Sequence, residues 1–232
     1  MSNKVKCTAT IGAALAILAC SPSRSAPPAP DTVHPAAPSA ATATQPDPLL
    51  IAADHGRIEG DANAKTWLIV ASDFQCPYCK QWHDASYKAV YDEYVRPGKI
   101  KVAYVNFPLS QHPNAMPTAE AAMCASAQGK FWEYHEALFA TQYKWASLPS
   151  PAAVLDSIAG AVAVDKAVWH QCLASGKMRP LIMADRNRAA AAGVQSTPSF
   201  IIGDQVLLGA QPIETLRAAL DAEIAKNGGA AH

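Results

Sequence analysis

Two cysteines separated by two residues are the strongest chemical signal in the chain. Cys76 and Cys79 enclose Pro77 and Tyr78, and they follow an apolar run over residues 67–71. A Cys-x-x-Cys pair at a turn from strand to helix is typical of a dithiol redox site. Pro77 suits the first position of a helix, so we expect Cys76 at the helix N-terminus, where free N–H groups and the dipole favour a thiolate. Cys79 then lies one turn further in, close enough to form a disulfide with Cys76.

Two other uses of such a pair fit the sequence less well. Zinc needs four ligands, and the chain has no second Cys-x-x-Cys and no Cys-x-x-His. Covalent haem attachment needs histidine directly after the pair, where Lys80 stands. A copper or zinc carrier that uses the dithiol stays open as a different class of function; its nearest extra ligand is His83, which we expect to be a surface or packing residue. We therefore expect no metal site and no cofactor beyond the redox-active disulfide.

The N-terminus predicts export. A positively charged start is followed by an apolar run over residues 8–19, which is too short to span a bilayer. The run ends in Ile-Leu-Ala-Cys, which resembles a bacterial lipobox. We therefore expect residues 1–20 to be a lipoprotein-type signal and Cys20 to carry the lipid. An ordinary secretory signal, cut after Ser23, is the alternative; both place the protein in an oxidising compartment, the periplasm or cell envelope.

Composition divides the remaining chain into a linker and one domain. Residues 21–48 hold eight prolines and few large apolar groups, so this segment cannot bury a core and is expected to tether the protein to a membrane. Residues 49–228 suffice for a single domain with a full core. The formal net charge is zero, so no nucleic-acid partner is indicated.

Cys124 and Cys172 remain after the other cysteines are assigned. Cys7 leaves with the signal, and an even remainder in an exported protein suggests a structural disulfide. Two buried free thiols and a second redox relay are the alternatives.

The apolar periodicity predicts an α/β fold. Strands over 66–72 and 100–107 flank a helix over 79–95, which makes a right-handed parallel βαβ unit. Residues 112–193 are alanine-rich and helical, and we expect His135 there to be a hydrogen-bonded core residue. Strands at 199–202 and 205–208 form a hairpin, and a last helix starts at Pro212. The expected helices of the central stretch lie near 114–128, 130–143, 151–160, 165–174 and 178–192.

These features together resemble the DsbA-like branch of the thioredoxin superfamily, over about residues 54–225. The resemblance implies a thioredoxin fold with an inserted helical subdomain at about 112–193. It also implies that Pro198 is cis and faces the dithiol, and that the backbone at Thr197 pairs with an extended substrate peptide. Pro77 and Tyr78 would then contribute to the substrate surface. The segments that carry the resemblance are residues 72–79, Phe107-Pro108-Leu109 with His112-Pro113, Gly129-Lys130-Phe131-Trp132 and residues 193–200.

The resemblance also implies an enzyme, a protein thiol-disulfide oxidoreductase. A stabilised Cys76 thiolate favours the reduced enzyme, so the expected direction is oxidation of exported proteins, with an unidentified redox partner to restore the disulfide. Many oxidase-type relatives place an acid six positions before the first cysteine, where this chain has Val70, so an isomerase or reductase on the same fold is the alternative. Asp73 either caps the redox helix or is solvated.

Overall fold

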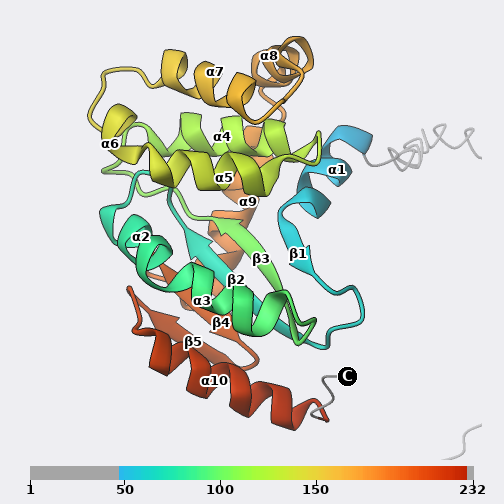
Figure 1. Ribbon diagram of the computed structural model, residues 1–232. Coiled ribbons are helices and arrows are strands. Elements are labelled where there is room, and N and C mark those ends of the chain that lie inside the picture. Colours follow the sequence, from blue (N-terminus) through green and yellow to red (C-terminus); the bar gives the residue numbers. More distant parts are fainter. Residues whose placement is uncertain (1–46, 229–232) are drawn as a thin grey trace, which may run out of the picture. The chain divides into compact units, whose positions relative to one another are not determined.

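A five-stranded mixed sheet forms the centre of the molecule in this computed structural model, in the order β1-β3-β2-β4-β5 (Figure 1). The structure describes residues 47–228, so the expected signal, Cys20 and nearly all of the expected linker lie outside the described residues. β2 pairs in parallel with β3, while the β1–β3, β2–β4 and β4–β5 pairs are antiparallel. The strands are β1 (Ile58–Gly60), β2 (Thr66–Ser72), β3 (Ile100–Asn106), β4 (Ser199–Ile202) and β5 (Gln205–Leu208).

β2 lies in the middle because both of its faces are apolar. Leu68 and Val70 on one face are buried, and so is Ala71 on the other. A strand covered on both sides is expected at the centre of such a sheet. The predicted parallel pairing of this strand with residues 100–106 is confirmed.

One long helix from Pro77 to Val95, here called the redox helix, covers one face of the sheet together with α10 (Ile213–Lys226). It comprises α2 (Pro77–Trp82), a π-helical turn η1 (His83–Tyr87), α3 (Lys88–Val90) and a second π-helical turn η2 (Tyr91–Val95). π-helical turns are rare in proteins overall, and many of those known lie at functional sites. The apolar layer between these helices and the sheet includes Leu68, Val70, Trp82, Val90, Tyr94, Phe200, Leu216 and Leu220.

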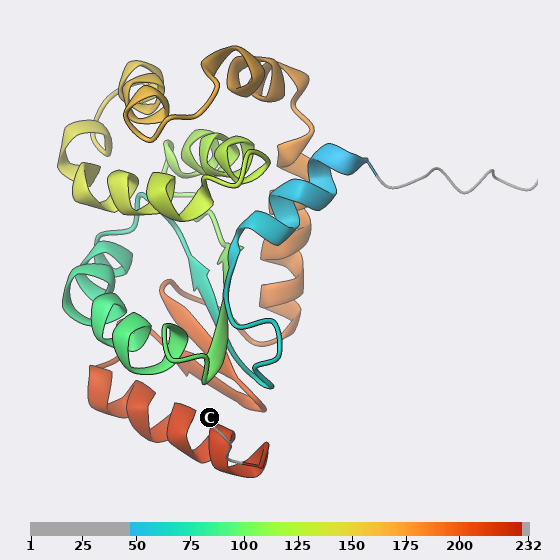
Figure 2. The same ribbon diagram turned by 45° about the vertical axis from the view of Figure 1, so that its right-hand side comes forward.

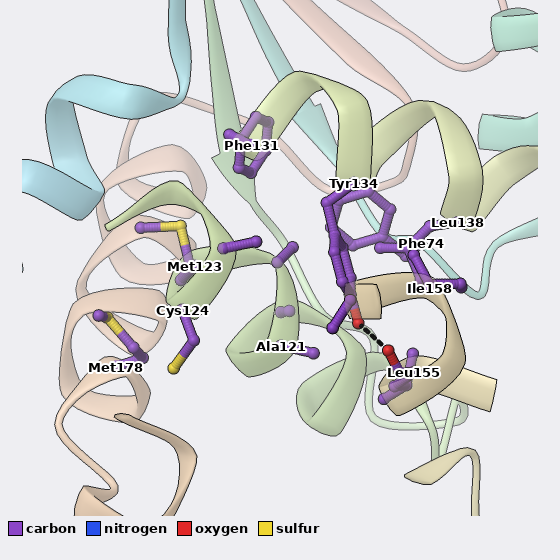
Figure 3. Packing of buried hydrophobic residues seen from close by; sticks show 14 of the residues in the cluster. Phe74, Ala121, Met123, Cys124, Phe131, Tyr134, Leu138, Leu155, Ile158 and Met178 are labelled. Atoms are coloured by element: carbon purple, nitrogen blue, oxygen red, sulfur yellow. Dashed lines mark hydrogen bonds between the residues drawn. The ribbon is translucent and has the colours of Figure 1, made fainter. Parts of the chain in front are cut away.

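The inserted helices gather at one end of the sheet (Figures 1 and 2). Phe74 and Tyr104 join their core from the sheet side, with ring centroids 4.8 Å apart. Within the subdomain the Tyr134 hydroxyl donates to the Leu155 carbonyl oxygen at 2.9 Å (Figure 3). The inserted helices are α4 (Ala115–Ser126), α5 (Phe131–Ala140), α6 (Gln142–Trp145), α7 (Ala152–Ala161) and α8 (Lys166–Ser175).

α9 (Met178–Ala191) belongs to two cores at once. Met178 and Ile182 near its start pack in the core of the inserted helices. Ala189 near its end packs with Ala71 and Phe107 on the face of the sheet opposite the redox helix. The sequence-predicted thioredoxin fold with an inserted helical subdomain is confirmed, and α9 is the helix that returns the chain to the sheet.

The start of the domain differs from the sequence prediction. The first element expected from the sequence was the strand over 66–72, but α1 (Pro48–Gly56) and the edge strand β1 precede it. Asp47 caps α1 by accepting a hydrogen bond from the Leu49 N–H at 3.0 Å. α1 lies close against α4 at Gly56. A Cβ atom at this position would come within 2.5 Å of the Ser126 carbonyl oxygen, so the close approach requires glycine. Within residues 47–228 no helix is both long and apolar enough to cross a membrane.

Candidate active site

Cys76 stands at the junction between the central strand and the redox helix. Its backbone is extended, with φ −67° and ψ 123°, and Pro77 begins α2 directly after it. The Cys76 N–H donates to the Asp73 carbonyl oxygen at 3.0 Å, which closes the turn that follows β2. Cys76 therefore sits where the first N–H groups of the redox helix point toward its sulfur.

Thr197 and Pro198 face Cys76 from the other side of the site. The Thr197–Pro198 peptide bond is cis, and Ser199 after it starts β4, which pairs with β2. The Cys76 sulfur lies 3.5 Å from the Thr197 carbonyl oxygen. The Thr197 hydroxyl is buried and has no hydrogen-bond partner apart from the Cys76 sulfur. The strand pairing thus brings together two of the sequence-predicted segments.

The surroundings of Cys76 lower the pKa of its thiol to about 6. The largest cause is a hydrogen bond from the Cys79 side chain, opposed by burial of the sulfur. The Thr197 side chain and the N–H groups of Cys79 and Tyr78 lower the pKa further. Cys76 is therefore largely a thiolate at neutral pH, which is the reactive form of a cysteine.

Cys79 has the opposite character. Its side chain is buried, and burial is the main cause that raises its pKa well above the ordinary value. Its hydrogen bond to Cys76 and the charge of that thiolate raise the pKa further. In the structure both cysteines are free thiols. The pair thus combines one nucleophilic sulfur with one that keeps its proton.

The exposed part of the site is the pair of residues between the cysteines. Tyr78 is 63% exposed and Pro77 is also exposed, whereas Cys76 is 3% exposed and Pro198 is buried. Tyr78 and Pro77 thus form the exposed surface next to the buried Cys76 sulfur.

Asp73 neither caps the redox helix nor is solvated, so both alternatives from the sequence are wrong. Its buried carboxylate accepts hydrogen bonds from the N–H groups of Gln75, at 2.8 Å, and Leu109, at 3.0 Å. His112 Nδ1 lies 2.7 Å from the second carboxylate oxygen. Burial raises the pKa of Asp73, against the lowering effect of these hydrogen bonds. Asp73 holds the turn before Cys76 against the segment after β3.

The inserted subdomain also holds this turn, through residues that belong to no sequence motif. The Gln142 side-chain amide donates to the carbonyl oxygens of Phe74, at 2.7 Å, and Cys76, at 3.1 Å. The Gln75 side chain accepts from the Asn114 N–H at 2.6 Å. These hydrogen bonds join residues 39 to 68 positions apart in the sequence, so no local pattern could indicate them.

Val70 lies in β2 where oxidase-type relatives have an acid. It is 3% exposed and belongs to the apolar layer beneath the redox helix. No carboxylate can therefore be supplied to Cys79 from this position.

Cys124 and Cys172 form a disulfide between α4 and α8. Both residues are buried, and 48 positions separate them in the sequence. The bond cross-links the inserted subdomain and lies in its core, so it is structurally separate from the pair at Cys76 and Cys79.

Comparison with known proteins agrees with this fold. A family model described as Thioredoxin matches residues 52–222. The probable disulfide bond formation protein D of Bacillus anthracis is 23% identical over 173 residues, which cover 72% of this chain and 77% of that protein. The crystal structure of alpha-DsbA1 from Wolbachia pipientis has a TM-score of 0.66 at 20% identity, and the match covers 73% of this chain and 91% of that one.

A third similarity covers only part of a much longer protein. The Na(+)/H(+) antiporter NhaA 3 of Salinispora tropica is 31% identical over 168 residues, which are 72% of this chain and 24% of the antiporter. The chain thus spans about a quarter of the length of that relative.

The sheet, the dithiol at the start of the redox helix and the Thr197–Pro198 segment opposite it define a dithiol protein of the thioredoxin type. The chain belongs to the thioredoxin family. The expected DsbA-like fold is confirmed by the match to alpha-DsbA1.

Proposed function

We propose that the protein is a thiol-disulfide oxidoreductase that oxidises pairs of thiols in exported proteins. The observation that carries this proposal is the asymmetry of the dithiol: the pKa of Cys76 is lowered to about 6, and the pKa of Cys79 is raised. Stabilising the Cys76 thiolate stabilises the reduced protein, and a dithiol whose reduced form is stable is an oxidant.

The proposed reaction starts from the Cys76–Cys79 disulfide. A substrate thiolate attacks the Cys76 sulfur, the bond to Cys79 breaks, and Cys79 takes up a proton. A second substrate thiolate then attacks the substrate sulfur of this mixed disulfide, and Cys76 leaves as a thiolate. Two electrons pass from the substrate dithiol to the enzyme, and an external redox partner must remove them to restore the disulfide.

The geometry supports a substrate position between Tyr78 and Thr197. Tyr78 is exposed beside Cys76, and the Thr197 carbonyl oxygen lies 3.5 Å from the Cys76 sulfur. An extended substrate peptide could add its backbone beside the Thr197–Pro198 segment, as in strand addition.

The proposed location is the periplasm or cell envelope, with the protein held to a membrane by a lipid on Cys20. Support comes from the charged start, the short apolar run and the Ile-Leu-Ala-Cys sequence. A Cys20→Ala variant should move from the membrane to the soluble fraction and lose incorporation of labelled fatty acid. Unchanged membrane association would contradict the lipid anchor.

A direct test uses the purified, oxidised protein and a reduced, unfolded protein that contains several cysteines. We expect stoichiometric formation of disulfides in the test protein, measured by mass spectrometry after alkylation. A Cys76→Ser variant should be inactive, and a Cys79→Ser variant should accumulate the mixed disulfide at Cys76. If the protein instead reshuffles a scrambled test protein but cannot oxidise a reduced one, the isomerase alternative is correct.

A further inference from the structure

Three metal-ligating side chains meet beside the redox helix, apart from the dithiol. His83 is the first residue of η1, while His135 and Glu136 lie on α5. One ligand atom from each lies within 4.8 Å of the other two. Among the described residues this is the one such group of three, and it contains neither cysteine.

The distances suit a small tetrahedral ion. His83 Nε2 lies 2.9 Å from Glu136 Oε1, and His135 Nδ1 lies 3.5 Å from the same oxygen. Ligand atoms about 2.0–2.2 Å from a tetrahedral zinc ion are ~3.3 Å from one another. The two distances to Glu136 lie on either side of this value, and the ligand atoms of His83 and His135 lie within 4.8 Å of each other, so the two imidazole rings have to approach slightly when the ion binds.

His135 supplies an unsatisfied polar atom that faces this group. The residue is 2% exposed, and its Nδ1 has no hydrogen-bond partner. The ring packs among aromatic rings, including Phe139 and Tyr104 at centroid distances of 5.0 and 5.5 Å. The expectation of a hydrogen-bonded core histidine is wrong for this nitrogen, which lies 3.5 Å from Glu136 Oε1 without forming a hydrogen bond to it. Because a buried polar atom without a partner destabilises the fold, a ligand for this atom is expected.

The second ring nitrogen of His83 has the neighbour that metal-bound histidines usually have. His83 Nδ1 lies 3.3 Å from Asp84 Oδ1, and Lys80 donates to the other Asp84 oxygen at 2.7 Å. A carboxylate at the outer nitrogen fixes the orientation of the ring and makes the inner nitrogen a better ligand.

Glu136 gives the group access to solvent. It is an exposed residue that lines a cleft of about 660 Å³, together with Tyr87, Trp132 and Glu133. Glu59 and Asp92 also line this cleft, as does Lys88, which pairs with Asp92, so acidic residues outnumber basic ones there. Acidic clefts raise the local concentration of cations, and Glu136 is the ligand through which the group borders this cleft.

We propose that His83, His135 and Glu136 bind one divalent transition-metal ion, most favourably Zn²⁺, and that this ion joins the redox helix to the inserted subdomain. Imidazole and carboxylate are ligands that suit zinc. The site is independent of the proposed thiol chemistry, and it departs from the sequence-based expectation of no metal.

The test uses zinc chloride and the purified protein with Cys76 and Cys79 locked as their disulfide, so that no thiolate of the pair can bind the metal. Calorimetric titration should give one zinc ion per chain, and zinc should raise the melting temperature because it binds the folded state. Cobalt(II) at the same site should give the intense visible absorption of tetrahedral coordination.

Variants distinguish this site from other surface ligands. Glu136→Gln and His83→Gln should each lower zinc affinity by more than ~100-fold, and Asp84→Asn by ~10–100-fold, as expected for an outer partner of a ligand. His170→Gln is the matched control, because His170 pairs with Asp156 at 2.8 Å on the surface of α8; it should leave the affinity unchanged. Glu136 is exposed, so its substitution should not unfold the protein, and circular dichroism without metal checks this.

Three results would overturn the proposal: no binding at millimolar zinc, affinity kept in Glu136→Gln, or affinity lost in His170→Gln. None of them bears on the Cys76–Cys79 reaction, which is measured without metal.

Discussion

The sulfur of Cys76 lies 3.5 Å from the carbonyl oxygen of Thr197, a residue 121 positions later in the chain. The contact exists because β4 pairs with β2, which places the segment before β4 against the end of the central strand. It puts the nucleophilic sulfur beside the Thr197 carbonyl oxygen and beside the Thr197 hydroxyl, which has no other hydrogen-bond partner. Reactivity and substrate binding are therefore expected to depend on the same few atoms.

The first prediction concerns the pH dependence of Cys76. Alkylation of the reduced protein by iodoacetamide should follow a single titration with a midpoint near pH 6, because the pKa is lowered to about 6. Since the folded-state pKa lies below that of a free cysteine, the extra stability of the reduced protein is present at alkaline pH and is lost as the pH falls through about 6. A midpoint at pH 8 or above would contradict the proposed thiolate.

The second prediction isolates the Thr197 hydroxyl. Thr197→Val keeps the shape of the side chain but removes the donor, so the alkylation midpoint should rise by about 1 pH unit, the equivalent of losing one hydrogen bond to a charged sulfur. Thr66→Val is the control: Thr66 is a buried threonine at the opposite end of β2. If both variants shift the midpoint equally, the effect is not due to the hydroxyl at Thr197.

The third prediction concerns the disulfide between Cys124 and Cys172. Replacing both with alanine should lower the free energy of unfolding by about 3–4 kcal/mol, because the bond closes a long loop in the unfolded chain. The alkylation rate of Cys76 should stay the same, since the bond lies in the inserted subdomain. In the unaltered protein, gentle reduction should open Cys76–Cys79 first; reduction of both bonds together would contradict a purely structural role.

The fourth prediction concerns a buried ion pair that joins the start of the domain to α9. Arg57 is 5% exposed and pairs with Asp185, which is 1% exposed. Arg57→Met should cost about 3–5 kcal/mol in the free energy of unfolding, because it leaves a buried carboxylate without its main partner. Arg217→Met removes a partly exposed partner of Glu93 and should change stability only slightly. If the two substitutions lowered the free energy of unfolding equally, burial would not determine how much each ion pair contributes to stability.

The parts of the fold that could be predicted from the sequence are those with a strong local pattern. The apolar run 67–71 and the helical spacing after Cys79 defined the βαβ unit, and turn residues marked the late hairpin. β1 could not be predicted, because a strand of three residues is too short to show alternation. α1 was missed because Pro48 appeared to continue the proline-rich segment.

The sequence predicted which residues of the candidate site react, but not the hydrogen bonds that hold them in place. Cys76 and Cys79 carry a motif, and Thr197 and Pro198 were found through the family resemblance. The roles of Gln142 and Asn114 depend on how the inserted helices dock onto the turn before Cys76. Hydrogen bonds between residues far apart in the chain produce no recognisable sequence pattern. The same is true of the proximity of His83 and His135.

The most direct test of the proposed direction is the reduction potential of the Cys76–Cys79 pair, measured by equilibrating the purified protein with glutathione buffers at pH 7. Lowering the Cys76 pKa from 9.0 to about 6 stabilises the reduced form about tenfold at this pH, which makes the potential ~30 mV more oxidising. We expect a potential above roughly −200 mV, as an oxidant of exported proteins requires. A value near that of thioredoxin, roughly −270 mV, would contradict the proposed oxidation and identify the protein as a reductase.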